Sequence, residues 1–265
     1  MYAFEYQRPT SRDAATGAAA GDARYLAGGQ SLVQAMRLRL SQSERLIDLG
    51  AIDELKAIGV DKNNAIRIGA MATHAAVAAH ADVKRLAPAL AELAGGIGDP
   101  MVRNMGTIGG SIANADPAAC YPTAVLALGA TIHTDGRTIA ADDFFTGLYE
   151  TELEPGELVT AVSFPSAQKA AYVKFKQQAS RFALVGVFVA QTASGVRVAV
   201  TGAKSHVFRA TPIEDALTKR FTPDAAKAVR MPTDDINADL HGSAEYRAAM
   251  ISVMAARAVA AALSR

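Results

Sequence analysis

Two short glycine-rich segments contain the residue types that can bind a phosphate group. Adjacent glycines let backbone N–H groups approach an anion without an intervening Cβ, and a neighbouring hydroxyl can donate to a phosphate oxygen. The first segment consists of Ala27, Gly28, Gly29, Gln30, Ser31 and Leu32. It is neither a P-loop nor a Rossmann fingerprint, because no lysine follows the glycines and the spaced glycine pattern is missing. An ordinary turn between a strand and a helix is the alternative.

The second segment repeats this chemistry later in the chain. It consists of Gly106, Thr107, Ile108, Gly109, Gly110, Ser111, Ile112, Ala113 and Asn114. Two such segments can clamp a pyrophosphate from two sides, so the pair is more informative than either member. Buried glycine turns without a ligand remain the alternative.

Two lysines on a predicted strand can supply positive charge. In an extended segment Tyr172, Lys174 and Lys176 share one face, and Val173 and Phe175 share the other. Cations beside a redox cofactor stabilise the negative charge that develops when it is reduced. Solvated lysines of an edge strand are the alternative.

The sequence gives little support for a metal site, a catalytic nucleophile or a disulfide. The five histidines are scattered, and the closest pair, His74 and His80, does not share a helix face. The run from Gly109 to Ala113 resembles a relaxed nucleophile elbow that lacks its Asp and His partners. The single cysteine, Cys120, excludes an intrachain disulfide and cannot hold an iron–sulfur cluster by itself. We therefore expect no metal site and a reducing, cytoplasmic setting.

The overall composition predicts a globular chain that binds neither nucleic acid nor a membrane. Its 265 residues include 27 basic and 26 acidic side chains, which gives a formal net charge of +1, and half of them are apolar. The longest apolar run, Phe182 to Ala190, is too short to span a bilayer. Met1 to Pro9 has no Sec-type signal.

The spacing of apolar residues predicts the elements that position these segments. Arg24–Ala27 is expected to be a strand that enters the first glycine segment, and Ser31–Leu40 the helix that leaves it. Ala75–Ala94 favours helix, interrupted at Pro88. Gly95–Pro122, rich in glycine and proline, predicts a long ordered loop that contains the second segment. Further strands are predicted at Leu46–Leu49, Ala65–Ala70, Ala124–His133 and Leu158–Phe164.

A separate C-terminal unit is predicted after the polar segment Pro165–Lys169. Strand-like segments at 172–176, 181–190 and 196–201 predict a meander. Helices are expected around Ile213–Lys219 and over Ser243–Leu263, where Ser243 can cap the N-terminus.

Five segments, taken in order, resemble the medium, FAD-binding subunits of the xanthine dehydrogenase and carbon monoxide dehydrogenase class of molybdenum hydroxylases. They are Ala27–Leu32 (AGGQSL), Gly98–Ala113 (GDPMVRNMGTIGGSIA), Asn114–Pro122 (NADPAACYP), Lys174–Gly186 (KFKQQASRFALVG) and Asp235–Arg247 (DINADLHGSAEYR). The resemblance implies an α+β fold. Residues 1–165 would form an FAD-binding domain of the PCMH (vanillyl-alcohol-oxidase-like) type, with subdomains at about 1–55 and 56–165. Residues 166–265 would form a small sheet-and-helix domain.

The resemblance also implies which residues hold FAD. Residues 27–32 and 106–114 would wrap its pyrophosphate and ribityl chain, and the isoalloxazine would lie near Leu158, Val159 and Lys176, with Lys174 as the competing register. A Gly109→Val substitution would then abolish FAD retention by blocking backbone approach.

One departure from the family pattern concerns the sugar hydroxyls of the cofactor. Many relatives read Asp-Pro-Ala-Ala-Asp where this chain has Asp116 to Cys120. A thiol accepts hydrogen bonds poorly, so Asp116 or a backbone carbonyl would replace the second aspartate, or FAD would bind more weakly.

A redox subunit without substrate chemistry of its own is the function that the resemblance implies. A small partner subunit would carry 2Fe–2S clusters and a large one molybdopterin, which would explain why this chain needs no cysteine ligands. The expected assembly is a dimer of heterotrimers. Electrons would pass through the clusters to FAD and then to an external acceptor. The alternatives are a self-sufficient flavin oxidase or reductase and a partner protein without cofactor.

Overall fold

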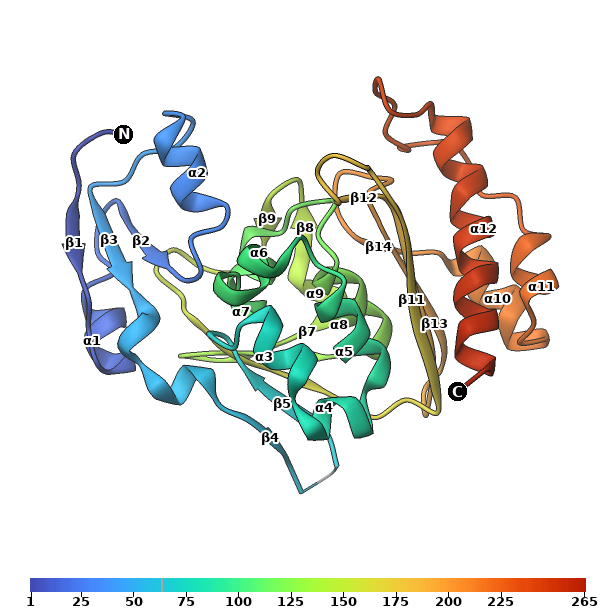
Figure 1. Ribbon diagram of the computed structural model, residues 1–265, viewed down its shortest axis with the longest axis horizontal. Coiled ribbons are helices and arrows are strands. Elements are labelled where there is room, and N and C mark those ends of the chain that lie inside the picture. Colours follow the sequence, from blue (N-terminus) through green and yellow to red (C-terminus); the bar gives the residue numbers. More distant parts are fainter. Residues whose placement is uncertain (63) are drawn as a thin grey trace.

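The N-terminal lobe is built on short strands that alternate with helices. β1 (Glu5–Gln7), β2 (Ala23–Leu26) and β3 (Arg45–Asp48) pair in parallel in the order β1-β3-β2 (Figure 1). Parallel strands need crossover connections, and α1 (Arg12–Gly17) and α2 (Leu32–Arg37) supply them. The 3-10 helices Leu49–Ala51 and Asp53–Lys56 then lead to the centre of the molecule. The computed structural model describes residues 1–62 and 64–265.

An antiparallel sheet forms the centre of the molecule. Its strands lie in the order β4 (Ile58–Val60), β5 (Ile66–Gly69), β10 (Val159–Phe164), β6 (Thr131–Thr134) and β7 (Thr138–Ala140). Between β5 and β6 the chain forms α3 (His74–Ala79), α4 (Ala81–Leu86), α5 (Pro88–Gly95), α6 (Pro100–Met105), α7 (Ile108–Asn114) and α8 (Tyr121–Leu128). After β7 come α9 (Ala141–Phe144) and the hairpin of β8 (Phe145–Gly147) and β9 (Glu150–Thr151).

The two faces of the central sheet differ because alternate residues of a strand point in opposite directions. Ile68, Ile132 and Val162 are buried in one core with the helices that follow β5. Arg67 and His133, which alternate with these residues, lie on the other face. The helices therefore cover one side of the sheet.

The C-terminal part is a meander flanked by helices, as predicted. β11 (Lys169–Lys176), β12 (Ala183–Thr192), β13 (Gly195–Thr201) and β14 (Phe208–Arg209) pair in sequence order. One face of the sheet reaches the central core through Phe188, Ala190 and Ala199. The other face packs its valines against α12 (Ala244–Leu263), with α10 (Thr211–Lys219) and α11 (Pro223–Lys227) alongside (Figure 1). The predicted Ser243 cap is confirmed, since its side chain accepts from the N–H of Tyr246.

Residues 95–122 are largely helical, so the predicted irregular loop is wrong. Asp99 caps α6 and Pro100 occupies its first position, while Thr107 caps α7. Proline suits the first helical turn, because the N–H that it lacks would have no partner there. Gly109 and Gly110 lie inside α7, where they allow close packing instead of ending the helix.

The strand predicted at Ala124–His133 is wrong over its first half. Residues through Leu128 belong to α8, which ends at Gly129 in a left-handed conformation (φ +62°), and β6 begins only at Thr131. Every residue of α8 is buried. A helix without a polar face shows no amphipathic period, and a short apolar run then resembles a buried strand.

Helix α12 alone, in the described part of the chain, is long and apolar enough to cross a membrane. About half of its most apolar stretch, 56%, is buried inside the protein. Ile251, Met254 and Val259 belong to the core between α12 and the meander. Packing on this sheet accounts for the apolar character of the helix.

Candidate functional site

The first glycine segment leaves β2 as a loop with free backbone donors. Gly29 has a φ of +69°, a left-handed conformation that glycine adopts without strain. Among the described residues, no partner exists for the backbone N–H groups of residues 29–32, and Ser31 makes no side-chain cap on α2. Such a run of unpaired donors can bind an anion.

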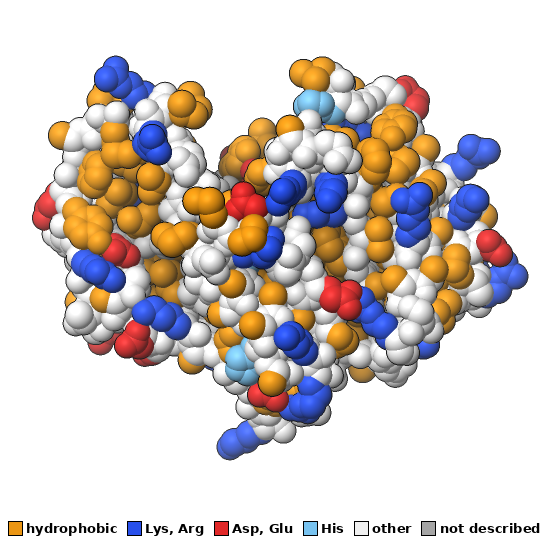
Figure 2. Space-filling view, in the orientation of Figure 1, with side chains coloured by type: hydrophobic (Ala, Val, Ile, Leu, Met, Phe, Trp, Pro, Cys, Tyr) orange, Lys and Arg blue, Asp and Glu red, His pale blue; other side chains and the backbone are white. Residues whose placement is uncertain are grey.

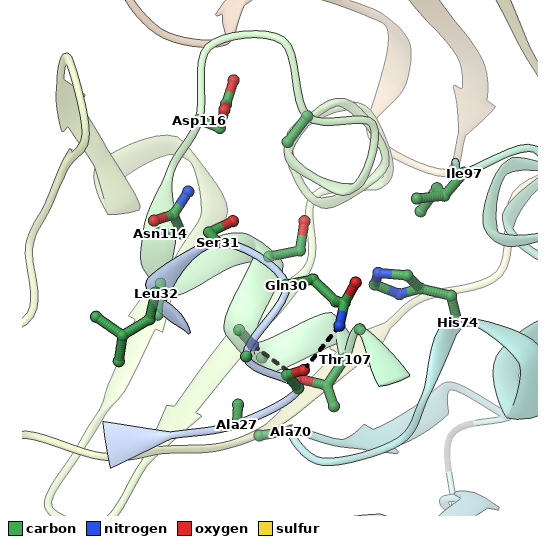
Figure 3. Close-up of a pocket in the computed structure, with 18 of the residues that line it drawn as sticks. Ala27, Gln30, Ser31, Leu32, Ala70, His74, Ile97, Thr107, Asn114 and Asp116 are labelled. Carbon is green, nitrogen blue, oxygen red and sulfur yellow. Dashed lines mark hydrogen bonds between the residues drawn. The ribbon is translucent and has the colours of Figure 1, made fainter. Parts of the chain in front are cut away.

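The second glycine segment forms the start of α7, and its first donors are already paired. The N–H groups of Ile108 and Gly109 donate to the carbonyls of Ala72 and Ala70, at 3.1 Å and 2.8 Å. The N–H of Gly110 donates to Thr107 Oγ1 at 3.1 Å (Figure 3). The N–H groups of Ile108, Gly109 and Gly110 are therefore already used within the protein, in contrast to those of the first segment.

The glycines of the two segments allow protein backbones to meet. A Cβ on Gly28 would lie 2.1 Å from the carbonyl oxygen of Met105, and one on Gly109 would lie 2.5 Å from the Cβ of Ala70. A Cβ on Gly110 would lie 3.3 Å from the Cβ of Ala27, on the other segment. The glycines thus bring the two segments together as the wall of one site.

A cavity of about 420 Å³ opens where these segments meet. Figure 2 shows the surface hollowed between the lobe that carries α2 and the centre of the molecule. The predicted site residues that line the cavity are Ala27, Gly28, Gly29, Gln30, Ser31, Leu32, Gly106, Thr107, Gly109, Gly110, Ser111, Ala113, Asn114, Asp116, Leu158 and Val159. Ile108 and Lys176 do not line it, because Ile108 is buried in the central core and Lys176 lies exposed at the end of β11.

Lys174, and not Lys176, is the lysine that lines the cavity. Its Nζ donates to the carbonyl of Gly96 at 2.9 Å and lies 3.5 Å from Cys120 Sγ. Lys176 is the last residue of β11 and is exposed, while the register shift beside it places the extra residue, Leu184, in β12. Within the described residues Lys174 forms no ion pair, so it brings a positive charge to the cavity wall.

Asp116 and Cys120 both line the cavity. Asp116 Oδ1 accepts from the N–H of Ala118 at 2.8 Å, and its Oδ2 accepts from the Tyr149 hydroxyl at 3.4 Å. A carboxylate has lone pairs beyond these two contacts, so Asp116 can also accept from a ligand hydroxyl. Cys120 is buried, with 6% of its surface exposed.

Several lining residues escaped the sequence-based prediction. They are Arg24, Tyr25, Leu49, Ala70, Met71, His74, Ile97, Gly98, Val102, Ala118, Ala119, Leu153, Glu157, Ser180, Arg181 and Phe182. A signal did exist for those that lie inside the segments that carry the family resemblance, namely Gly98, Val102, Ala118, Ala119, Ser180, Arg181 and Phe182. His74 also gave a signal, as an isolated polar residue at the start of an alanine-rich helix. The others reach the cavity through long-range packing that leaves no local pattern.

Hydrogen bonds hold several of these residues in place around the cavity. The Tyr25 hydroxyl donates to the carbonyl of Gly156 at 2.7 Å, and burial raises its pKa to about 12. Arg181 donates to the carbonyl of Gly98 at 3.2 Å, which ties the β11–β12 turn to the segment before α6. Glu157 accepts from Arg137, and this bond lowers the pKa of Glu157 to about 2.

The residues present fit a dinucleotide such as FAD. The unpaired donors of residues 29–32 suit a pyrophosphate, and Asp116 suits a sugar hydroxyl. The isoalloxazine ring, which gains negative charge on reduction, is suited by the positive charge of Lys174. It is also suited by the apolar side chains of Ile97, Leu158 and Phe182.

Comparisons with known proteins agree with this geometry. Residues 2–167 match the family described as FAD binding domain in molybdopterin dehydrogenase. The carbon monoxide dehydrogenase medium chain of Hydrogenophaga pseudoflava is 36% identical, over 99% of this chain and 98% of that one. The nicotine 6-hydroxylase medium subunit of Paenarthrobacter nicotinovorans is 34% identical, over 92% of this chain and 91% of that one.

Solved structures show the same architecture over the whole chain. A carbon monoxide dehydrogenase structure from Hydrogenophaga pseudoflava superposes with a TM-score of 0.88 at 37% identity, covering 98% of this chain and 97% of that chain. Reconstituted CO dehydrogenase from Oligotropha carboxidovorans gives 0.90 at 33% identity, covering 100% and 99%.

Fold and site together define the flavoprotein subunit of an oxidoreductase, with the α+β fold of the PCMH type. The chain belongs to the family of FAD-binding medium subunits of molybdenum hydroxylases.

Proposed function

We propose that this chain holds FAD in the cavity and passes electrons from 2Fe–2S clusters on a small partner subunit, through FAD, to an external acceptor. A large partner subunit would carry molybdopterin, in a dimer of heterotrimers in the cytoplasm. The observation that carries the proposal is the cavity itself, where unpaired donors, a carboxylate and an unneutralised lysine converge. Relatives named as medium chains support the existence of partner subunits.

Each group on the cavity wall has a distinct role in this proposal. Bound FAD would supply the chemistry of accepting and releasing electrons. The N–H groups of residues 29–32 bind its pyrophosphate, and Asp116 accepts hydrogen bonds from sugar hydroxyls. Lys174, in the role first expected of Lys176, stabilises negative charge on the reduced ring. Leu158 and Val159 exclude water from that end of the cavity.

The domain division at residue 165 is part of the proposal. Residues 165–168 connect β10 of the central sheet to β11 of the meander, and the two sheets share no strand. The short N-terminal sheet has a small core around Ile47 and Leu49, to which Met71 and Leu158 of the central part also contribute. Most of its residues precede residue 56, which supports the further subdivision near residue 55.

Purification from the native host with a tag on this chain tests the proposal. We expect a yellow complex that contains FAD, iron and molybdenum, together with two further subunits. The isolated chain should bind FAD when reconstituted. A chain that stays colourless after incubation with FAD would contradict the redox role, and a lone chain with complete oxidase activity would favour the self-sufficient alternative.

A further inference from the structure

His74 is a buried polar residue of the cavity wall whose ring has no hydrogen-bond partner among the residues that the structure describes. It is the first residue of α3, and its backbone N–H donates to the carbonyl of Gly106 at 2.9 Å. The side chain lines the cavity, yet the residue is only 5% exposed. Nδ1 is buried and unpaired, and Nε2 makes no hydrogen bond to any described residue. A buried polar group in this state requires an explanation.

Close packing fixes the orientation of the His74 ring. Its centroid lies 5.3 Å from that of the Tyr121 ring. On another side Gly106 lies against it, so closely that a Cβ on this glycine would be 2.6 Å from Nε2. Figure 3 shows the ring directed toward the side chain of Gln30, across from Asn114 and Asp116. The ring is therefore held rigidly at one end of the cavity, beside Ile97.

The His74 ring is neutral at physiological pH. Burial, with a smaller contribution from the charge of Arg103, lowers its pKa to about 4. A neutral imidazole has one donor and one acceptor nitrogen and no charge with which to attract a phosphate. Its natural partner is an uncharged polar group. The flavin–ribityl half of FAD offers such groups as ring carbonyls, ring nitrogens and hydroxyls.

We propose that His74 is a cofactor-binding residue that hydrogen-bonds an uncharged polar group of the flavin–ribityl half of FAD. The inference rests on the proposed function, because it requires FAD in this cavity. The missing partner of the ring is then supplied by the cofactor. The buried, unpaired Nδ1 destabilises the protein without FAD, as binding groups held ready for a ligand commonly do.

The test compares wild type with His74→Phe, which keeps a packed ring but removes both nitrogens. FAD affinity, the visible spectrum of bound flavin and the melting temperature without FAD are measured for each. We expect the Kd for FAD to rise roughly 3- to 10-fold, the range for one lost neutral hydrogen bond. The flavin bands should shift, while the melting temperature without FAD stays the same or rises.

His133→Phe is the matched control. His133 pairs with Ser163 at 2.8 Å on the face of the central sheet that the helices leave uncovered, and it does not line the cavity. This variant should retain wild-type FAD affinity and flavin spectrum.

Two results would overturn the inference. One is a His74→Phe variant whose affinity and flavin spectrum match wild type. The other is weaker binding accompanied by a lower melting temperature without FAD, which would show that His74 acts by supporting the fold. Failure of wild type itself to bind FAD would instead refute the proposed function.

Discussion

At the scale of single residues, Gly109 shows how closely two backbone segments of this protein approach each other. A Cβ on Gly109 would lie 2.5 Å from the Cβ of Ala70 and 2.7 Å from its carbonyl oxygen. The N–H of Gly109 also donates to that oxygen. Gly109 is therefore a contact between α7 and the end of β5. A larger side chain at Gly109 is therefore expected to disturb this packing. The sequence suggested a different effect, in which the side chain blocks the approach of the backbone to FAD.

We predict that Gly109→Ala lowers stability by about 1–3 kcal/mol, because backbone and a buried Cβ cannot move aside cheaply. FAD affinity should fall too, since the shift would displace the wall of the cavity. Urea unfolding and FAD titration measure both effects. Gly59→Ala is the control, as a Cβ there would meet nothing within 4 Å. Equal stability of the two variants would argue against the contact.

His74 should also make stability depend on pH. Its pKa is about 4 in the folded chain, below the ordinary value of 6.5 that applies to the unfolded chain. Between these values the unfolded chain takes up a proton that the folded chain does not. Stability without FAD should therefore fall as the pH drops from about 6.5 to about 4, by up to roughly 3 kcal/mol. From pH 7 to pH 4.5 the urea midpoint of wild type should fall by more than that of His74→Phe, so that the difference between the two midpoints widens. Parallel profiles would contradict the prediction.

At the scale of elements, a buried arginine anchors the last helix to the meander. Arg247, in the first turn of α12, is 4% exposed. Its Nη1 donates to the carbonyls of Leu184 and Gly202, both at 2.8 Å, and its Nη2 donates to Asp239 Oδ2 at 2.7 Å. One guanidinium group thus holds together the start of β12, the end of β13 and the segment before α12.

Arg247→Met should destabilise the chain by about 2–5 kcal/mol, because the substitution leaves two carbonyls and a carboxylate without their donor. Chemical unfolding followed by circular dichroism measures the loss. Arg257→Met, on the same helix but exposed, provides the control and should change stability little. Similar midpoints for both variants would show that the anchor contributes nothing.

At the scale of the whole molecule, the central and C-terminal parts share a core. Phe188, Ala190 and Ala199 of the meander are buried together with residues of α5 and α8. The cavity is likewise lined from both parts, since Lys174, Arg181 and Phe182 join the glycine segments around it. The proposed division at residue 165 therefore separates sheets that fold against each other.

We expect a fragment of residues 1–165 to expose this core and to lack a sharp thermal transition, whereas the full chain unfolds in one step. Circular dichroism melting and binding of an apolar dye distinguish the two. FAD binding by the fragment should be weak, because Lys174 and Arg181 are missing. A fragment with a sharp transition and full affinity would show that the parts are independent.

Local patterns in the sequence were enough to predict much of this fold. The strand before Gly28, the meander and the Ser243 cap depend on contacts within a few residues or on alternation along one strand. Such signals are readable because caps and periodicity act locally. The helices α6 and α7 were missed because the glycines inside α7 and on either side of α6 resemble turn residues until the close packing that requires them is known.

The sequence by itself determined the two glycine segments, the family and about half of the residues of the cavity wall. Only the tertiary structure decided that Lys174 lines the cavity and Lys176 does not, because the other segments of the cavity wall are distant from β11 in the sequence. It also decided that the first segment keeps free donors while the second uses its own to reach Ala70 and Ala72. These choices depend on which distant backbones meet, and no local pattern encodes that.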